Sequence, residues 1–140
     1  VGRQRPLLVD PLGLIIVCVV HAANQQDRDG AKAVFAHLQR AMYTIRLIWA
    51  DGAYGGALIE WVLSLRYRCK MVLEIVRRNK ATQGFEVLPK RWIVERTFAW
   101  LGRYRRLSKD YEHLTDSGES MIYIAMIGLM ARRLARCRLA

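Results

Sequence analysis

Apolar residues at the start of the chain fall into two runs that predict a β-hairpin. The first run is Leu7–Val9 and the second is Leu14–Val20, and both consist almost entirely of leucine, isoleucine and valine. Between them lies Asp10-Pro-Leu-Gly13, whose aspartate, proline and glycine are typical of a turn. The second run is apolar without alternation, which indicates a strand that is covered on both faces.

Helical periodicity predicts three amphipathic helices in the rest of the chain. The residues expected to face a core recur at three- and four-residue steps. They are Ala31, Val34, Phe35, Leu38 and Met42 in the first helix, Ala57, Leu58, Trp61, Val62 and Leu65 in the second, and Val94, Phe98 and Leu101 in the third. His37 falls outside the first stripe, so we expect it on the surface.

Two further strands and a final helix complete the predicted elements. The strands are Thr44–Ala50 and Met71–Val76. The final helix is expected from about Ser117 to Arg138, and Asp116–Glu119 is similar to a capping box at its start. Its segment Met121–Ala131 is apolar nearly all round, so we expect it to be buried. The order strand, strand, helix, strand, helix, strand, helix, helix is typical of an α/β layer.

The composition indicates one basic globular domain. The 140 residues are 53% hydrophobic, which excludes a disordered chain, and the net charge is +11. Arginines and lysines cluster at positions 77–80, 103–106 and 132–138. A polyanion is therefore the favoured partner, nucleic acid first and an anionic membrane surface second. A basic protein without such a partner is the weaker interpretation.

The cysteine spacing indicates a reducing compartment. The lengths of the apolar runs argue against a membrane-spanning helix. The three cysteines form no C-x-x-C pair, which argues against a zinc site or a disulfide framework. Cys18 lies in an apolar run and is expected to be a small core residue. The longest apolar runs are shorter than the roughly 20 residues that a spanning helix needs, and no signal peptide precedes the first strand. Because Val1 opens directly on a strand-like segment, we expect the chain to begin within a domain.

Two acidic residues, Asp51 and Glu95, are candidates for a functional site. Judged from their local sequence alone, each also has a purely structural interpretation. Asp51 ends a predicted strand and is followed by glycines, and ligands of α/β sheets bind at the carboxyl ends of strands. Glu95 lies one helical turn from Arg91. Taken alone, Asp51 is better interpreted as a residue that stabilises a turn, and Glu95 with Arg91 as a solvated ion pair.

Three other aspartates are assigned local roles. Asp10 opens the predicted turn, where its side chain can accept hydrogen bonds from nearby backbone, so we do not assign it to a catalytic site. Asp27 and Asp29 lie in a polar loop at a helix start. We expect one of them to cap that helix rather than bind metal.

The neighbourhoods of Glu95 and Asp51 resemble those in DDE transposases encoded by bacterial insertion sequences. Arg91-Trp-Ile-Val-Glu95-Arg-Thr-Phe-Ala-Trp-Leu resembles the block that carries the glutamate of the Asp-Asp-Glu triad. Leu47-Ile-Trp-Ala-Asp51-Gly-Ala-Tyr-Gly resembles the block of the second aspartate, and residues 2–14 resemble the block just downstream of the first. The family's fuller signature has a tyrosine three residues before the arginine and a lysine seven residues after the glutamate. This sequence has Leu88 and Gly102 at those two positions.

The resemblance implies that residues 1–140 are the carboxy-terminal part of a DNA-cutting and DNA-joining domain. The implied fold is a ribonuclease-H-like α/β core without its first strand, which lies centrally in that fold and carries the first aspartate. Asp51 and Glu95 would be catalytic metal ligands for Mg²⁺ or Mn²⁺, and the partner would be double-stranded DNA. The resemblance also implies an upstream segment that supplies the missing strand, a homo-oligomer and a bacterial cytoplasmic location.

Six cations are candidate DNA contacts. They are Arg77, Arg78, Lys80, Arg91, Arg103 and Arg106. The first three lie in a basic loop of the kind that contacts backbone phosphates. The resemblance places the other three at the phosphate near the scissile bond, and Arg103 or Arg106 could supply the missing lysine. On a continuous helix, Arg106 would return to within about 20° of Glu95.

Three functional interpretations remain open at the level of sequence. The first is a transposase fragment that becomes active when another segment supplies the first aspartate. The second is a remnant that binds DNA without cutting it, and the third is a basic binding module that keeps the fold without metal chemistry. Asp51 and Glu95 in their family context favour the first.

Overall fold

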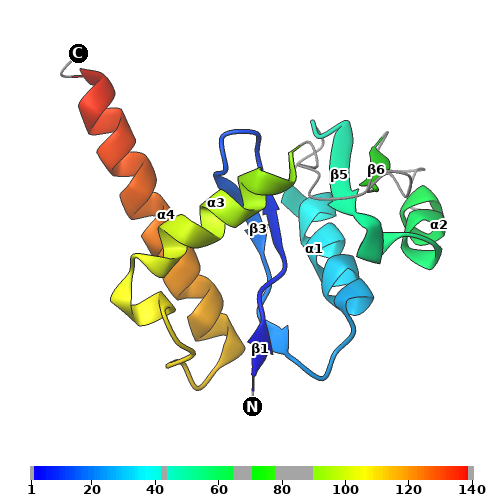
Figure 1. Cartoon of the computed structure of the whole chain (residues 1–140), viewed down its shortest axis with the longest axis horizontal. Coiled ribbons are helices and arrows are strands. Elements are labelled where there is room, and N and C mark those ends of the chain that lie inside the picture. The colour runs from blue at the N-terminus through cyan, green and yellow to red at the C-terminus, as the bar shows by residue number, and fades with distance from the viewer. Residues whose placement is uncertain (1, 42–43, 65–70, 78–89, 139–140) are drawn as a thin grey trace, which may run out of the picture.

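The computed structural model describes residues 2–41, 44–64, 71–77 and 90–138. Among the described residues, strands β1 to β4 come first, helices and strands then alternate from α1 to β6, and helices follow (Figure 1). The strands are β1 (Arg3–Gln4), β2 (Leu7–Val9), β3 (Ile15–Cys18), β4 (His21–Ala22), β5 (Leu47–Asp51) and β6 (Val72–Val76). The helices are α1 (Asp27–Ala41), α2 (Ala57–Ser64), α3 (Arg91–Gly102) and α4 (Thr115–Arg138), with 3₁₀ turns η1 (Gly52–Tyr54) and η3 (Arg105–Leu107).

The predicted hairpin at the start of the chain is confirmed, because β2 pairs with β3 in antiparallel orientation. Asp10 begins its turn and accepts hydrogen bonds through Oδ1 from the backbone N–H groups of Leu12 (2.9 Å) and Leu14 (2.8 Å). Gly13 follows at φ +80°, and a Cβ there would lie 2.9 Å from the Thr97 hydroxyl oxygen. Only glycine therefore fits this position, both for its backbone angle and for the close approach of α3.

β5 and β6 form a parallel pair in which Leu47 lies opposite Val72 and Asp51 lies opposite Val76. Both strands were predicted, although β5 starts at Leu47 rather than at Thr44. Parallel neighbours need a crossover connection, and the chain between them includes η1 and α2. The carboxyl ends of the two strands consequently meet at one edge of the sheet.

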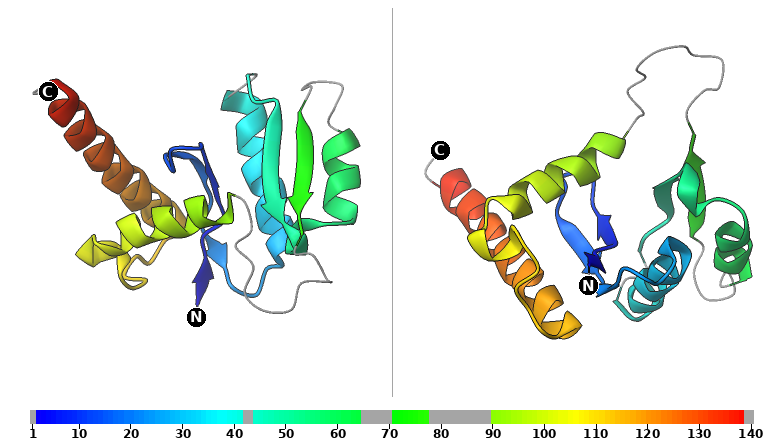
Figure 2. Two further views of the ribbon diagram at one scale, coloured as in Figure 1. Left: turned by 45° about the horizontal axis from the view of Figure 1, so that its top comes forward. Right: turned by 60° about the horizontal axis from the view of Figure 1, so that its bottom comes forward.

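Within the described residues, the strands form three separate two-stranded sheets: β1 with β4, β2 with β3, and β5 with β6. The hairpin and the β5–β6 pair are distinct units with α1 between them (Figures 1 and 2). No ladder joins β2 to β5. A mixed α/β fold is thus confirmed, and the finer ribonuclease-H-like arrangement stays a prediction.

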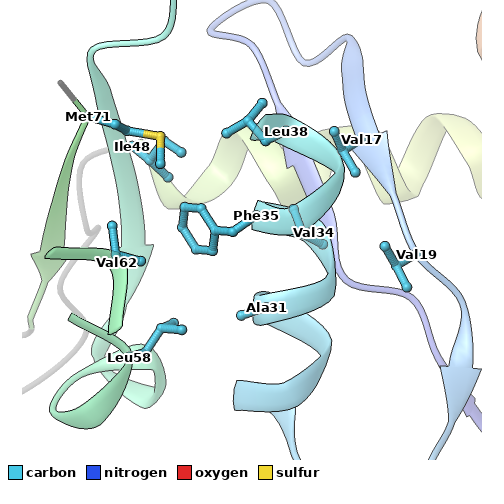
Figure 3. Close-up of a cluster of buried hydrophobic side chains, with 10 residues drawn as sticks. All are labelled: Val17, Val19, Ala31, Val34, Phe35, Leu38, Ile48, Leu58, Val62 and Met71. Carbon is cyan, nitrogen blue, oxygen red and sulfur yellow. The ribbon is translucent and has the colours of Figure 1, made fainter. Parts of the chain in front are cut away.

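Helix α1 contributes to the first of two apolar clusters. Phe35 points from α1 toward Val62, Ile48 and Met71, while Val17 faces the helix from β3 (Figure 3). The predicted core faces of α1 and α2 are largely confirmed: Ala31, Val34, Phe35, Leu38, Leu58 and Val62 are buried, Trp61 is half-buried and Ala57 is exposed. Met42 and Leu65 lie outside the described residues. His37 is exposed, as predicted.

The second cluster joins β3 to α3, η3 and α4 around Cys18, Leu101 and Ile122. Burial, reinforced by the nearby Glu119 carboxylate and opposed by Arg5, raises the pKa of the Cys18 thiol to about 12. Cys18 therefore remains a neutral thiol at physiological pH, in agreement with the core role predicted for it.

Helix α4 supplies hydrogen-bond acceptors to the backbone at β3 and just beyond it. Tyr123 accepts through its hydroxyl from the Cys18 N–H (2.9 Å), and Glu119 accepts through Oε1 from the Val20 N–H (2.7 Å). The prediction of a capping box at Asp116–Glu119 was therefore wrong about Glu119, whose carboxylate binds the strand instead. These bonds satisfy backbone donors on the side of the hairpin that faces α4.

Two predictions about burial were wrong. Phe98 is 41% exposed, and its neighbour Thr97 is fully buried in its place. In α4, Ile124 and Ile127 are each 59% exposed, so Met121–Ala131 is covered on one side only. Periodicity identifies the apolar sides of a helix, but the crossing angle of the helix decides which side is covered. Among the described helices, none is long and apolar enough to cross a membrane.

Thr97 gives the first testable prediction, because its buried hydroxyl donates to the Gly13 carbonyl at 2.7 Å and ties α3 to the hairpin turn. Thr97→Val keeps the volume but leaves that carbonyl unsatisfied, so we expect the free energy of unfolding to fall by about 1–3 kcal/mol. Urea denaturation measures it, with Thr44→Val at an exposed position as the matched control. Equal stability of the two variants would contradict this role.

Candidate functional site

A cavity of about 490 Å³ lies between the β2 and β5 regions and is bordered by α3. Leu7 and Leu8 line it from the hairpin, and Ile48 and Ala50 line it from β5. Both acidic residues predicted from the sequence, Asp51 and Glu95, also line this cavity. The structure therefore brings them to one site, with apolar side chains behind them.

Asp51 reaches the site because it is the last residue of β5. Strand alternation puts Leu47, Trp49 and Asp51 on the exposed face of β5, whereas Ile48 is buried on the other face. Oδ1 of Asp51 accepts a hydrogen bond from the Ala53 N–H at 2.9 Å and thereby caps η1. The turn-stabilising role and a place in the site are thus compatible, because both follow from the strand end.

Glu95 reaches the site from the first turns of α3. Its Oε1 lies 3.3 Å from Nε of Arg91, which confirms the ion pair expected from their spacing. The two side chains are 61% and 65% exposed, so water screens the pair and it contributes little to stability. Both side chains are therefore available to bind something else.

A lysine that the sequence analysis did not assign also borders the cavity. Nζ of Lys90 lies 3.1 Å from the centroid of the Trp49 ring, a cation–π contact, and Trp49 donates from Nε1 to Oε2 of Glu74 at 2.8 Å. Lys90 precedes α3 with φ 68°, a left-handed conformation that is uncommon outside glycine. The sequence carries no signal of this contact, because it depends on how α3 enters over β5.

The remaining predicted cations have different surroundings. Arg77 follows β6 and lies at the same sheet edge as Asp51. Arg103 is exposed at the end of α3. The prediction that Arg106 shares a helix face with Glu95 was wrong. It assumed a continuous helix, but α3 ends at Gly102 and Arg106 lies in η3. Its Nε instead lies 2.8 Å from Oε1 of Glu112. Arg78 and Lys80 lie outside the described residues.

Stacked arginines and aromatic rings join α3 to α4. The guanidinium carbon of Arg96 lies 4.3 Å from the Trp92 ring centroid and 4.9 Å from that of Trp100, and Arg133 of α4 lies 4.4 Å from the centroid of Trp100. Spacings of four residues along α3 permit the first two contacts, whereas the third is tertiary. This stack links the two helices through cation–π contacts.

Comparison with known proteins identifies the family. The family described as "Transposase DDE domain" has a model that matches residues 1–129. The chain belongs to this family. No curated protein matches the chain, and no solved structure does.

The donor groups at this site of the transposase domain suit the hard cations that the family generally uses. Carboxylate oxygens are the ligands that Mg²⁺ and Mn²⁺ prefer, and Asp51 and Glu95 offer them at one cavity. Among the described residues, however, no group of three or more His, Cys, Asp or Glu could hold a metal ion. Asp10 is bound in its turn, and Asp29 pairs with Lys32 at 3.5 Å, so neither adds a ligand.

The left-handed conformation of Lys90 gives the second prediction. Lys90→Gly and Lys90→Val both remove the ammonium group from Trp49, but only glycine adopts φ 68° without steric cost. We expect the valine variant to be less stable than the glycine variant by at least about 1 kcal/mol. Urea denaturation of the pair measures the difference. Equal stability would show that α3 can start in another conformation.

Proposed function

We propose that this transposase domain cuts and joins DNA by phosphoryl transfer at the cavity lined by Asp51 and Glu95. The observation that carries the proposal is the meeting of these two carboxylates at one cavity in a chain of the DDE family. Each carboxylate comes from the block whose sequence resembles that of a triad residue. Exposure of both side chains supports the proposal, because a metal-bound DNA strand needs access to them.

Asp51 and Glu95 would hold Mg²⁺ or Mn²⁺ in this proposal. Ions held there would supply activation of the attacking water or 3′-hydroxyl and stabilisation of the leaving oxygen. Asp51 is fixed by the end of β5 and by its bond to Ala53. Arg91 positions the Glu95 carboxylate by their ion pair and stays one turn away, where it can contact a DNA phosphate.

The third carboxylate of the triad would come from an additional strand between β2 and β5. Support comes from the two strands themselves, which belong to different sheets and line the same apolar cavity. Strands in a sheet lie about 4.8 Å from their neighbours, so an inserted strand would hydrogen-bond on both sides. If it ran parallel to β5, its carboxyl end would lie beside Asp51. An aspartate at that end would complete the triad.

Double-stranded DNA is the proposed partner, both as element ends and as target. Arg77 and Arg91 lie near the two carboxylates, Arg103 is exposed farther along α3, and the chain carries a net charge of +11. Arg106 is a weaker candidate because Glu112 already pairs with it. A homo-oligomer and a bacterial cytoplasmic location belong to the same proposal.

The salt dependence of DNA binding gives the third prediction. The logarithm of the association constant should fall linearly with the logarithm of salt concentration, by about 0.9 for each phosphate contacted. Arg103→Gln should reduce that slope by about one. Lys32→Gln is the matched control, since it removes a cation that is paired with Asp29 on α1. Fluorescence anisotropy with a labelled duplex measures both, and affinity that is insensitive to salt would contradict DNA binding.

Strand complementation gives the fourth prediction and tests the proposed activity. The chain alone should not nick DNA that carries candidate element ends, even with Mn²⁺, because one carboxylate is missing. Joining it through a flexible linker to a segment of about six β-branched residues that ends in aspartate should allow nicking. Asp51→Asn and Glu95→Gln should each abolish this activity.

Two controls separate the possible outcomes. The same segment ending in asparagine should stabilise the fold without giving activity, because it pairs with both strands but adds no carboxylate. Nicking by the chain alone that depends on Asp51 would refute the need for another segment. If the segment ending in aspartate stabilises the protein but no nicking occurs, the result would favour a remnant that binds DNA without cutting it. If that joined protein also fails to bind Mn²⁺, the result would favour a basic binding module without metal chemistry.

A further inference from the structure

A stripe of exposed apolar side chains runs along α4. Ile124 and Ile127 are each 59% exposed, Leu134 is 67% exposed, and Ala131 between them is also exposed. The packed side of α4 carries Ile122, Ala125 and Met126, which are buried against the hairpin side of the molecule. At 3.6 residues per turn, the exposed stripe lies on the opposite side of the helix from these three residues.

The stripe has the spacing of a coiled-coil seam. Its members are Ser120, Ile124, Ile127, Ala131, Leu134 and Arg138, and all six are exposed. The steps between them alternate between four and three residues, which is the a/d pattern of a heptad repeat. We call these six positions the α4 seam. A lone solvent-facing helix has no need of this pattern, whereas a helix that packs against another helix does.

Apart from Arg138 at the end of the seam, the arginines of α4 lie away from it. The positions that flank the seam hold Met121, Tyr123, Gly128, Met130, Ala135 and Cys137, none of which is charged at neutral pH. Arg133 stacks on Trp100 at 4.4 Å, and Arg132 stacks on Tyr104 at 5.6 Å while donating to its hydroxyl. Arg136 lies on the same side as these two. The arginines thus continue the packed side of α4.

The charge pattern selects the class of partner for the seam. A DNA phosphate or an acidic helix would need cations beside the seam, and those positions are uncharged or small. An apolar helix face of the same kind fits. A second copy of this chain presents such a face, with its own Arg132, Arg133 and Arg136 on the other side of the helix.

We propose that the α4 seam binds the α4 seam of a second copy in antiparallel orientation. Antiparallel pairing sets Ile127 against Ala131 of the second copy and Ile124 against its Leu134, so that a large side chain fills the space left by a small one. Parallel pairing would set Ala131 against Ala131 and leave a gap. It would also bring Arg138 of both copies together, whereas antiparallel pairing places the two basic ends far apart.

The position of α4 leaves room for a second helix. Its carboxy-terminal half stands out from the rest of the chain in Figure 1 and in both views of Figure 2. Ser120 to Arg138 spans about 27 Å, and a contact of two helices of that length buries less than about 1,200 Å². The dimer should therefore be weak, with a dissociation constant of roughly 1–100 µM. This inference does not depend on catalysis or on metal binding.

Two complementary variants test both the dimer and its orientation. Ile127→Glu or Ala131→Lys puts a charge into the seam at an exposed position, so each variant should fold and be monomeric alone. In an antiparallel pair the two substituted positions face each other across the interface, and an equimolar mixture should form a heterodimer. In a parallel pair, Glu at position 127 would face Ile127 of the other variant, and Lys at position 131 would face Ala131, so the two charges would not be opposite each other. Leu12→Glu, at a 64% exposed apolar residue in the hairpin turn, is the matched control and should leave the dimer intact.

Sedimentation velocity of the nuclease-treated chain in high salt provides the measurement, because salt prevents residual nucleic acid from bridging copies. Circular dichroism of each variant confirms that it is folded. The inference is overturned if the unaltered chain stays monomeric up to a chain concentration of about 100 µM, the upper end of the expected dissociation constant. It is equally overturned if the variants dimerise alone or if their mixture remains monomeric.

Discussion

The arrangement of this chain depends on which strand edges have hydrogen-bond partners. Along β3, α4 supplies the Tyr123 hydroxyl to the Cys18 N–H and the Glu119 carboxylate to the neighbouring Val20 N–H. The β2 and β5 edges receive no strand partner from each other. A buried backbone group without a partner costs about 1–3 kcal/mol, so a strand that paired with these two edges would stabilise the fold. The acidic site lies at that same cavity.

The residues at the site are held by weak and replaceable contacts. Arg91 and Glu95 form an exposed ion pair, Asp51 accepts one backbone hydrogen bond, and Lys90 rests on the Trp49 ring. An exposed ion pair such as that of Arg91 and Glu95 contributes little to stability. In contrast, the Thr97 hydroxyl that holds α3 on the hairpin is fully buried. The fold thus fixes α3 from its inner side and leaves its outer side free for binding.

Helix α4 serves different purposes on its two sides. Its packed side closes the second apolar cluster and then continues as the arginines that stack on Trp100 and Tyr104. Its other side carries the seam, which is uncharged except for Arg138 at its end. In the two proposals, Arg77, Arg91 and Arg103 would contact DNA while the seam contacts a second copy, because these three arginines lie outside α4.

The sequence by itself determined the local features of this protein. Asp10 had to bind its own turn because turn chemistry is local, Asp51 had to end a strand because glycines follow it, and the Arg91–Glu95 pair followed from helical spacing. Only the tertiary structure decided that Thr97 rather than Phe98 is buried, that Arg106 turns to Glu112, and that Lys90 reaches Trp49. Periodicity defines the faces of an element, but crossing angles and chain ends decide what each face meets, and those depend on contacts between residues far apart in the sequence.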